Sequence, residues 1–328
     1  MLERIYRDAD VDLSILNGKT LAVLGYGIQG KAQAANARDS GCKVIIGCRG
    51  AADGSPSRDA ATADGFEAMS VADATKRADV LLVELADPVQ PSVYKAEIGP
   101  HLRPGMTLCF CHGFSVLYGQ VNLPKTVNSV LYVPNAPGKF VREKYLKGEG
   151  VYGCVAVDHD ATGDAMQIVL AISKAVGSTR AGVVEMTFQH ETEGDNFEEQ
   201  ILYGGAVHLM RACFNVMVEN GYPPSFAYAK AIRSLRSVID VMDENGIEEY
   251  LTNRCSRTCE FAVRTRGPRV INEDAIRAIF AETEQGIFAR DWIQEFSLGM
   301  PQLHRLRRTA RESAMEQTGA EWRKIFGV

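Results

Sequence analysis

Short apolar runs alternate with helix-favouring segments through the first half of the chain. The run at 21–24 leads into a glycine-rich turn and then into 31–41, a segment that favours a helix and ends at Gly41. Further apolar runs predict strands at 43–47, 78–85, 106–111 and 130–133, with a helix at 94–102. This alternation predicts a doubly wound parallel sheet, in which ligands bind at the carboxyl ends of the strands.

The pattern changes at about residue 184. Long amphipathic stretches replace the alternation of strands and helices, at 194–220, 224–245, about 272–284 and after Met300. We therefore expect α/β plus all-α architecture: a Rossmann-type dinucleotide-binding domain over 1–183, followed by an all-helical substrate and dimerisation domain over 184–328.

The glycines after the first strand follow the Gly-x-Gly-x-x-Gly spacing of dinucleotide sites. Gly25 permits the tight turn, Gly27 lets the main chain approach a pyrophosphate, and Gly30 lets helix and strand pack closely. The helix that follows would direct free N–H groups at the phosphates. Because strand, turn, helix and second strand come in the required order, we interpret this stretch as a dinucleotide site rather than a glycine turn that binds nothing.

The segment after the second strand bears on the choice between NADPH and NADH. An Asp or Glu usually follows this strand in NAD-preferring folds, but here Arg49 follows, with Ser55 and Ser57 in a polar loop. Guanidinium and hydroxyl groups can both bind a ribose 2′-phosphate, which favours NADPH. The alternative is that Arg49 stacks on the adenine and the loop is solvated.

Polar residues also stand where later strands end. His112 and Asn135 lie at two such ends, which favours a functional role for His112 over a structural one. The candidates for dinucleotide binding are Gly25, Tyr26, Gly27, Ile28, Gln29, Gly30, Arg49, Ser55, Ser57, Asp87, His112 and Gly138.

Two acidic residues four apart, Asp195 and Glu199, begin the helical half. On a helix both carboxylates would point from one face, and Mg²⁺ accepts one or two carboxylates completed by water and substrate. Carboxylates at a helix start also complement the helix dipole, so spacing alone leaves a solvated acidic face open.

Composition excludes several classes of partner. The 328 residues are 46% hydrophobic and 23% charged, with a net charge of −5 and no basic block, so we expect neither nucleic acid nor an anionic membrane as partner. No apolar run approaches the length of a membrane span and no signal-peptide core is present, so we expect a cytoplasmic protein. The eight cysteines include no CxxC pair and are interpreted as reduced, mostly buried thiols.

Taken together, these motifs resemble the ketol-acid reductoisomerase family in its short form. The resemblance covers nearly the whole chain. It lies in the stretches 6–15, 25–30, 112–115, 134–138, 191–200, 267–272 and 315–317. It implies a Mg²⁺-dependent alkyl shift on 2-acetolactate-type acids, followed by hydride transfer from NADPH to the resulting 2-keto acid.

The resemblance also implies roles for individual residues. Asp195 and Glu199 match the family's helix carboxylate pair on its first metal, His112 matches its strand-end histidine, and Ser256 matches its substrate-contacting serine. Helical domains of this family interlock as dimers, so we expect a homodimer or a higher homo-oligomer.

Two departures from the family pattern qualify these roles. Asn135 stands where the family has lysine, although Lys139 follows the motif. On a later helix the family places two glutamates four apart, which reach the metals of the partner subunit, and here Lys230 and Ser234 stand at those positions. An ammonium group would compete with a second metal, so we expect one magnesium at most.

Three interpretations follow. The favoured one is an NADPH-dependent reductase of a 2-keto acid or a derived imine that has lost the alkyl shift, with Lys230 or Lys139 assisting reduction or binding a substrate carboxylate. The second is a working reductoisomerase that serves valine and isoleucine synthesis. The third is a non-catalytic paralogue that binds a nucleotide or a partner.

Overall fold

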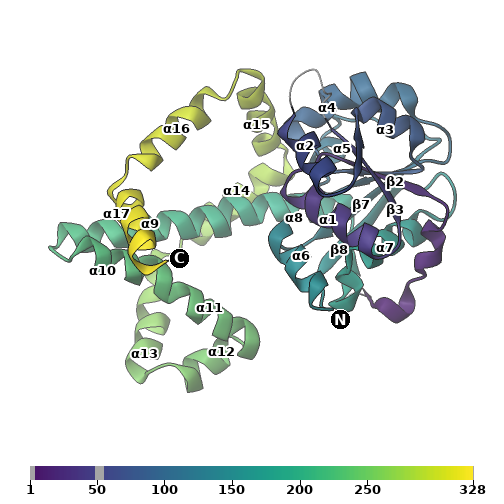
Figure 1. Cartoon of the computed structure of the whole chain (residues 1–328). Helices are drawn as coiled ribbons and strands as arrows, with labels where there is room; N and C mark the ends of the chain where they lie inside the picture. The colour runs from purple at the N-terminus through teal and green to yellow at the C-terminus, as the bar shows by residue number, and fades with distance from the viewer. Residues whose placement is uncertain (1–3, 49–54, 328) are drawn as a thin grey trace. The chain divides into compact units, whose positions relative to one another are not determined.

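The chain folds into two compact units, Met1–Gly194 and Asp195–Val328, in a computed structural model that describes residues 4–48 and 55–327 (Figure 1). The boundary predicted between residues 183 and 184 falls inside strand β9 (Val183–Glu185), which pairs with strand β8 of the first unit. The first turns of helix α8 (Phe188–Glu198) also belong to the first unit, so the chain leaves it later than the change of pattern suggested.

One sheet holds the strands of the first unit, in the order β1-β9-β8-β7-β6-β5-β2-β3-β4. The strands are β1 Ile5–Tyr6, β2 Thr20–Leu24, β3 Lys43–Gly47, β4 Glu67–Met69, β5 Val80–Val83, β6 Thr107–Phe110, β7 Asn128–Pro134, β8 Gly153–His159 and β9 Val183–Glu185. The strands from β4 through β2 to β7 run parallel, which confirms the predicted Rossmann-type core. The sheet continues beyond that core, because β8 pairs antiparallel with β7 and β1 pairs antiparallel with β9.

The order of strands reverses between β2 and β5. From β2 the chain moves outward through β3 and β4, and then returns to build β5, β6 and β7 on the other side. Every residue of β2 is buried, as expected of a strand covered on both faces. In folds of this kind the crevice outside the carboxyl ends of the strands at the reversal is the place where ligands bind.

Helices cover both faces of this sheet. Apolar residues of α1 and α7 pack on one face with Leu21 and Val23, and residues around α3 and η5 pack on the other with Ala22 and Leu24. The helical elements that belong wholly or mainly to this unit are η1 Asp8–Asp10, η2 Leu13–Leu16, α1 Ile28–Asp39, α2 Pro56–Ala63, α3 Val71–Arg77, η4 Asp87–Val89, α4 Gln90–Val93, η5 Tyr94–Ile98, η6 Gly99–His101, α5 Phe114–Leu117, α6 Gly138–Leu146, α7 Ala165–Val176, η7 Ser178–Arg180 and α8.

The second unit is helical throughout its described residues, as predicted. Its elements are η8 Glu199–Tyr203, α9 Gly204–Glu219, α10 Pro224–Tyr228, η9 Ala229–Arg233, α11 Ser234–Asn245, α12 Ile247–Glu249, η10 Tyr250–Arg254, α13 Arg257–Arg266, η11 Gly267–Val270, α14 Glu273–Glu284, α15 Ile287–Ser297, α16 Pro301–Arg311 and α17 Ala314–Phe326. Three of them, η8, η9 and η10, are π-helical turns within longer helices. Such turns occur often at functional sites.

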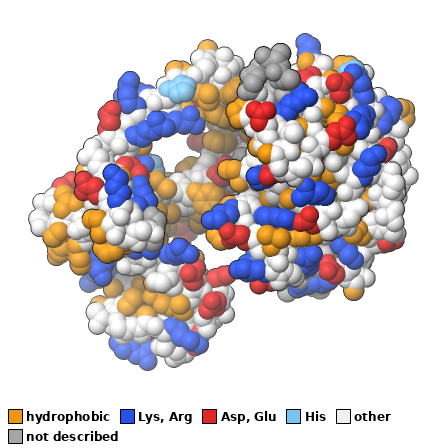
Figure 2. Space-filling view, in the orientation of Figure 1, with side chains coloured by type: hydrophobic (Ala, Val, Ile, Leu, Met, Phe, Trp, Pro, Cys, Tyr) orange, Lys and Arg blue, Asp and Glu red, His pale blue; other side chains and the backbone are white. Residues whose placement is uncertain are grey.

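The core of the second unit is small. Phe214, Ala227, Tyr228 and Met315 form its buried cluster, whereas many large apolar side chains on the same helices are exposed (Figure 2). Between residues 199 and 245 the exposed ones are Leu202, Tyr203, Val207, Leu209, Val216, Tyr222, Phe226, Leu235 and Ile239. Exposed large apolar side chains in such number are typical of an interaction site.

The part of the chain that the structure describes contains one helix long and apolar enough to span a membrane, although the sequence pattern predicts none. Segments α8, η8 and α9 join into one helix, Phe188–Glu219, which by length and composition alone could cross a membrane, and 6% of its most apolar stretch is buried. The apolar stretch was not recognised because the glycines and polar residues within it break up the run of hydrophobic letters.

Candidate functional site

The glycine turn closes tightly on the strands below it. Gly25 has φ +101°, and a Cβ there would lie 2.8 Å from the main-chain oxygen of Glu84. A Cβ on Gly30 would lie 2.1 Å from the main-chain oxygen of Gly25. The first glycine is therefore required by both backbone conformation and space, and the third is required by the packing of α1 against the turn.

A second loop closes the turn from the side of β7. The side-chain amide of Gln29 donates to the main-chain oxygen of Ala136 at 2.8 Å. A Cβ on Gly138 would lie 2.2 Å from the main-chain oxygen of Ile28, so the start of α6 touches the start of α1. Gln29, Ile28 and Gly138 thus build one cradle at the carboxyl edge of the sheet.

Gly27 is the open position of this cradle. It is the N-cap of α1 and offers no side chain to the free N–H groups, and a Cβ at Gly27 would meet no atom within 4 Å. The next residue, Ile28, is 77% exposed. A helix N-terminus with unoccupied main-chain donors and room above its glycine fits a dinucleotide pyrophosphate.

Other predicted cofactor residues have different positions. The ring of Tyr26 is buried against Phe66 and its hydroxyl donates to Asp64 at 2.9 Å, so only the main chain of Tyr26 is available to the cradle. Ser55 is the N-cap of α2 and Ser57 lies in its first turn, both half-buried. Arg49 lies outside the described residues.

His112 and Asp87 form a pair at neighbouring strand ends. Nδ1 of His112 lies 2.8 Å from a carboxylate oxygen of Asp87, and about a fifth of each side chain is exposed. A carboxylate at Nδ1 favours the tautomer that carries its proton there and orients the ring. The first turns of α8 pack against Gly113, the residue after His112. A Cβ on Gly113 would lie 2.1 Å from the hydroxyl oxygen of Thr192.

The residue at the family's lysine position lies at the end of β7. The side-chain amide of Asn135 donates to the thiol of Cys154 at 3.6 Å, and its main-chain N–H donates to the oxygen of Tyr152. Lys139, which could have replaced the missing ammonium, lies 3.7 Å from Glu143 on the exposed face of α6. The structure therefore gives Lys139 a surface partner on its own helix.

Asp195 and Glu199 lie at the junction of α8 and the π-helical turn η8. Asp195 is half-buried and Glu199 is exposed. Burial raises the pKa of Tyr203, and the carboxylates of Glu198, Asp195 and Glu199 raise it further, which shows that acidic charge gathers at this turn. Among the described residues no three His, Cys, Asp or Glu side chains form a metal-binding group. A carboxylate pair fits Mg²⁺ only when water or substrate completes the coordination.

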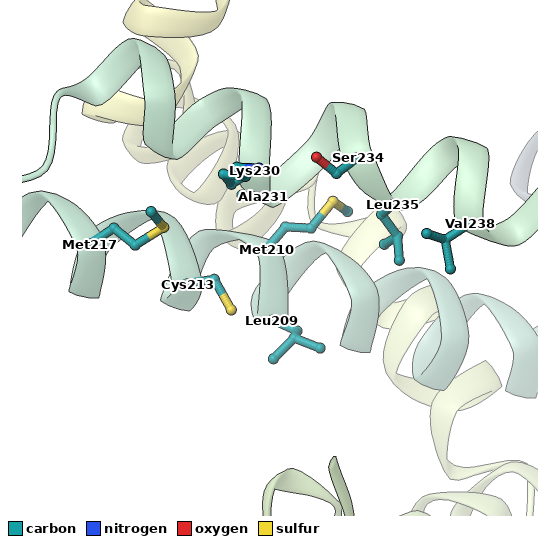
Figure 3. A pocket seen from close by; sticks show the side chains of 9 residues that line it. All are labelled: Leu209, Met210, Cys213, Met217, Lys230, Ala231, Ser234, Leu235 and Val238. Atoms are coloured by element: carbon teal, nitrogen blue, oxygen red, sulfur yellow. The ribbon is translucent and has the colours of Figure 1, made fainter. Parts of the chain in front are cut away.

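Lys230 and Ser234 line an apolar pocket of about 350 Å³ between α9 and the helix formed by η9 and α11 (Figure 3). The other lining residues are Leu209, Met210, Cys213, Met217, Ala231, Leu235 and Val238. Nζ of Lys230 lies 5.5 Å from the ring centre of Phe226, and the hydroxyl of Ser234 donates to the main-chain oxygen of Ala229 at 3.4 Å. The two side chains thus contact Phe226 and the main chain of Ala229 at the edge of an apolar pocket.

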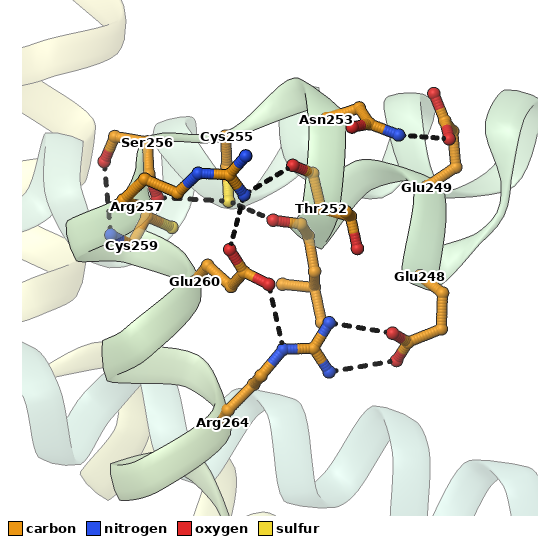
Figure 4. Close-up of polar contacts among 11 residues, drawn as sticks. Glu248, Glu249, Thr252, Asn253, Cys255, Ser256, Arg257, Cys259, Glu260 and Arg264 are labelled. Atoms are coloured by element: carbon orange, nitrogen blue, oxygen red, sulfur yellow. Dashed lines mark hydrogen bonds and ion pairs between the residues drawn. The ribbon is translucent and has the colours of Figure 1, made fainter.

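Ser256 caps a helix. Its hydroxyl oxygen accepts a hydrogen bond from the N–H of Cys259 at 3.1 Å at the start of α13, and the residue is exposed (Figure 4). Nearby, Glu260 accepts from Arg257 and Arg264, and the two arginines hold the pKa of that carboxyl below its usual range. Ser256 thus has a structural role, and its O–H proton is still available to a ligand.

Glu84 is a further residue of the site, beyond the candidates that the sequence motifs indicate. It follows β5 directly and lies under the glycine turn. A signal for it exists in the sequence, because it is the acidic residue inside an otherwise apolar stretch between Val80 and Leu85.

Comparisons with known proteins agree along the whole chain. Residues 15–182 match the family model described as acetohydroxy acid isomeroreductase, NADPH-binding domain, and residues 188–327 match that of the ketol-acid reductoisomerase C-terminal domain. The chain is 43% identical to ketol-acid reductoisomerase (NADP(+)) of Pyrobaculum neutrophilum, covering 99% of both chains. It is 41% identical to that of Methanocaldococcus jannaschii, covering 99% of this chain and 98% of the relative.

A solved structure shows the same similarity. The fold superposes on an NADH-preferring ketol-acid reductoisomerase from an uncultured archean with a TM-score of 0.95 and 39% identity, covering 99% of this chain and 100% of the other.

Proposed function

The chain belongs to the ketol-acid reductoisomerase family and is an NAD(P)H-dependent oxidoreductase, and from this membership we propose that it reduces a 2-keto acid, or an imine derived from one, with NADPH and without the alkyl shift. Membership in an oxidoreductase family disagrees with the non-catalytic interpretation. The resemblance noted from the sequence is confirmed by both family models.

The observation that supports loss of the alkyl shift is the chemistry at 230 and 234. The family has two carboxylates there, and this chain has an ammonium and a hydroxyl that face an apolar pocket. An alkyl shift develops an alkoxide beside a polarised carbonyl, which two divalent cations stabilise well. With Asp195 and Glu199 as the remaining carboxylate pair, at most one magnesium fits.

Hydride transfer requires fewer charged protein groups than the alkyl shift does. NADPH supplies the hydride when it is bound. The cradle of Ile28, Gln29 and Gly138, with its open position at Gly27, would hold the pyrophosphate, and Asp87 orients the ring of His112 at the adjacent strand end. A histidine oriented in this way can bind the cofactor or hold a proton near the reacting carbonyl.

A second candidate is a working magnesium-dependent reductoisomerase of branched-chain amino-acid synthesis. The observation that favours it is the 43% identity, over 99% of the chain, to a relative that carries that name. In that case the substitutions at Asn135, Lys230 and Ser234 would be tolerated changes of ligand.

Turnover of two substrates separates these candidates. We expect NADPH oxidation with 3-hydroxy-3-methyl-2-oxobutyrate, the product of the shift, and none with 2-acetolactate, whether Mg²⁺ or a chelator is present. Magnesium-dependent turnover of both compounds would instead establish the reductoisomerase. Parallel assays with NADH test the proposed preference for NADPH.

We also propose that the chain forms at least a homodimer through its second unit. The small core around Phe214 and the exposed apolar side chains of α9 and α11 leave the unit with too little buried surface of its own. A second copy explains the apolar helix at 188–219 better than a membrane does, because that helix carries Glu191, Glu193 and Arg211.

Light scattering during size-exclusion chromatography measures this assembly. We expect a mass of twice 35.9 kDa or a higher multiple. A change of Leu209 to glutamate, on the exposed apolar face, is expected to shift the mass towards one chain. A monomeric wild-type protein that unfolds cooperatively at the same temperature at every concentration would contradict the proposal.

A further inference from the structure

Glu84 lies at the reversal of strand order in the sheet. Leu24, the last residue of β2, pairs with Val83, the last residue of β5. Gly25 and Glu84 directly follow these two residues. The main-chain N–H of Glu84 donates to the oxygen of Leu24 at 2.9 Å, which continues the ladder by one residue. The glutamate therefore stands at the crevice where this fold places its ligand.

Two polar side chains from neighbouring elements surround the carboxyl. Gln33 of α1 and Cys111, directly after β6, both hydrogen-bond to Glu84, and the amide of Gln33 also donates to the thiol of Cys111 at 3.4 Å. Gln33 is 1% exposed, and its Oε1 has no hydrogen-bond donor. A buried acceptor without a donor is costly, and a protonated carboxyl group is a donor that can satisfy it.

Burial and hydrogen bonding act on the protonation of Glu84 in opposite directions. Burial raises the pKa of Glu84 to about 7, against the hydrogen bonds from Cys111 and Gln33, which lower it. Burial also raises the pKa values of Cys109, Cys111 and Tyr132, from β6 and β7, so these groups are uncharged at neutral pH. On the other sides, α1 presents the neutral Gln33 and β2 presents the main chain of Gly25.

The glycine turn rests directly on this residue. A Cβ on Gly30 would lie 3.2 Å from Cβ of Glu84, and one on Gly25 would lie 2.8 Å from its main-chain oxygen. A negative charge on Glu84 would occupy the positive end of α1, which the pyrophosphate of a dinucleotide also needs. A charged Glu84 and the pyrophosphate would therefore compete for the positive electrostatic potential at the start of α1.

We propose that Glu84 is a positioning residue of the dinucleotide site: it carries a proton, donates it in a hydrogen bond to Oε1 of Gln33, and so keeps an anion away from the phosphates at the glycine turn. The inference rests on dinucleotide binding by this family member and not on the identity of its substrate. It implies that nucleotide binding and proton binding at Glu84 favour each other.

The sign of the pH dependence follows from this coupling. At low pH the carboxyl is neutral and the turn binds the dinucleotide fully. As pH rises through 7 the free protein loses the proton and affinity falls, by at most one decade per pH unit until the bound form also ionises. Between pH 6 and pH 9 we expect Kd for NADPH to rise about tenfold, which is the effect of one unit charge on a nearby anion at an intermediate dielectric.

Calorimetric titration of the full chain with NADPH across this range tests the proposal. Glu84→Gln keeps the size and hydrogen bonds of the acid form, so its Kd should stay within about twofold of the wild-type value at pH 6 and should lack the tenfold rise. Glu67→Gln, at an exposed glutamate of β4 paired with Arg77, serves as the matched control and should follow the wild-type curve. Both comparisons cancel titrations that the proteins share, such as that of the 2′-phosphate.

A second measurement does not depend on the variant. Titrations of the wild-type protein at pH 7.5 in buffers of different ionisation enthalpy should show uptake of a proton on binding, and Glu84→Gln should take up less. Identical pH curves for wild type and Glu84→Gln would overturn the proposal and leave the reductase assignment standing. Absence of NADPH binding at every pH would overturn both.

Discussion

Gly27→Ala is expected to fold normally and to lose NADPH binding. An added Cβ would meet no protein atom within 4 Å, so the packing of the turn is unchanged. At an N-cap position alanine is less favourable than glycine, which costs about 1 kcal/mol or less. The methyl group would instead stand where the pyrophosphate approaches the main chain, and we expect Kd for NADPH to rise about a hundredfold or more.

Gly30→Ala is the matched comparison for Gly27→Ala. Its Cβ would lie 2.1 Å from the oxygen of Gly25, so α1 or the turn must move. Overpacking of this kind costs about 1–3 kcal/mol or more. We expect lower thermal stability and lost binding in Gly30→Ala, and lost binding alone in Gly27→Ala. Normal NADPH affinity in Gly27→Ala would show that the dinucleotide lies elsewhere.

The second large effect is expected from restoring the missing carboxylates. The double variant Lys230→Glu and Ser234→Glu removes an ammonium and adds two anionic oxygen ligands four residues apart on one helix. Together with Asp195 and Glu199 it should bind a second Mg²⁺. We expect the double variant to convert 2-acetolactate at a rate about a hundredfold or more above the background of the assay, at which the parent stays, because paired cations stabilise the alkoxide of the alkyl shift.

Calorimetry with Mg²⁺ measures the stoichiometry, and NADPH oxidation with 2-acetolactate measures the gain. Lys230→Gln with Ser234→Ala is the control, because it removes the charge without adding ligands and should gain neither metal nor turnover. If wild-type protein already converts 2-acetolactate as fast as the double variant does, the proposed loss of the alkyl shift is wrong.

The sequence predicted those parts of the fold that local patterns determine. The strand at 43–47 has the predicted bounds, because an apolar run between a charged residue and glycine needs no tertiary information. Strand β7 begins earlier than predicted, at Asn128. The polar side chain of Asn128 is buried, and its amide donates hydrogen bonds to Thr107 and Thr162. Strand β8 was not predicted at all, since its antiparallel pairing with β7 leaves no local mark.

In the candidate site, too, only the features that local sequence determines could be predicted. Glycine spacing indicated the cradle, but the buried ring of Tyr26 depends on Phe66 and Asp64, which lie on other elements. Glu84 was visible as an acidic residue in an apolar run. Its partners Gln33 and Cys111 come from two other elements, so its protonation could not be inferred from the sequence.

The π-helical turns of the second unit mark the places where its length can change by one residue. A π turn holds one residue more than the α turn it replaces, so η8, η9 and η10 each behave as a single-residue insertion that the helix has absorbed. Removing one residue within η8 would therefore turn it back into an α turn and leave α9 with its present rotation. Removing one residue between Met210 and Cys213 of α9 would instead rotate the rest of that helix by about 100°. Cys213 and Met217 would then no longer share a face with Leu209 and Met210, with which they line the pocket. The residue count of these helices is thus fixed in their α turns and can change by one at each π turn.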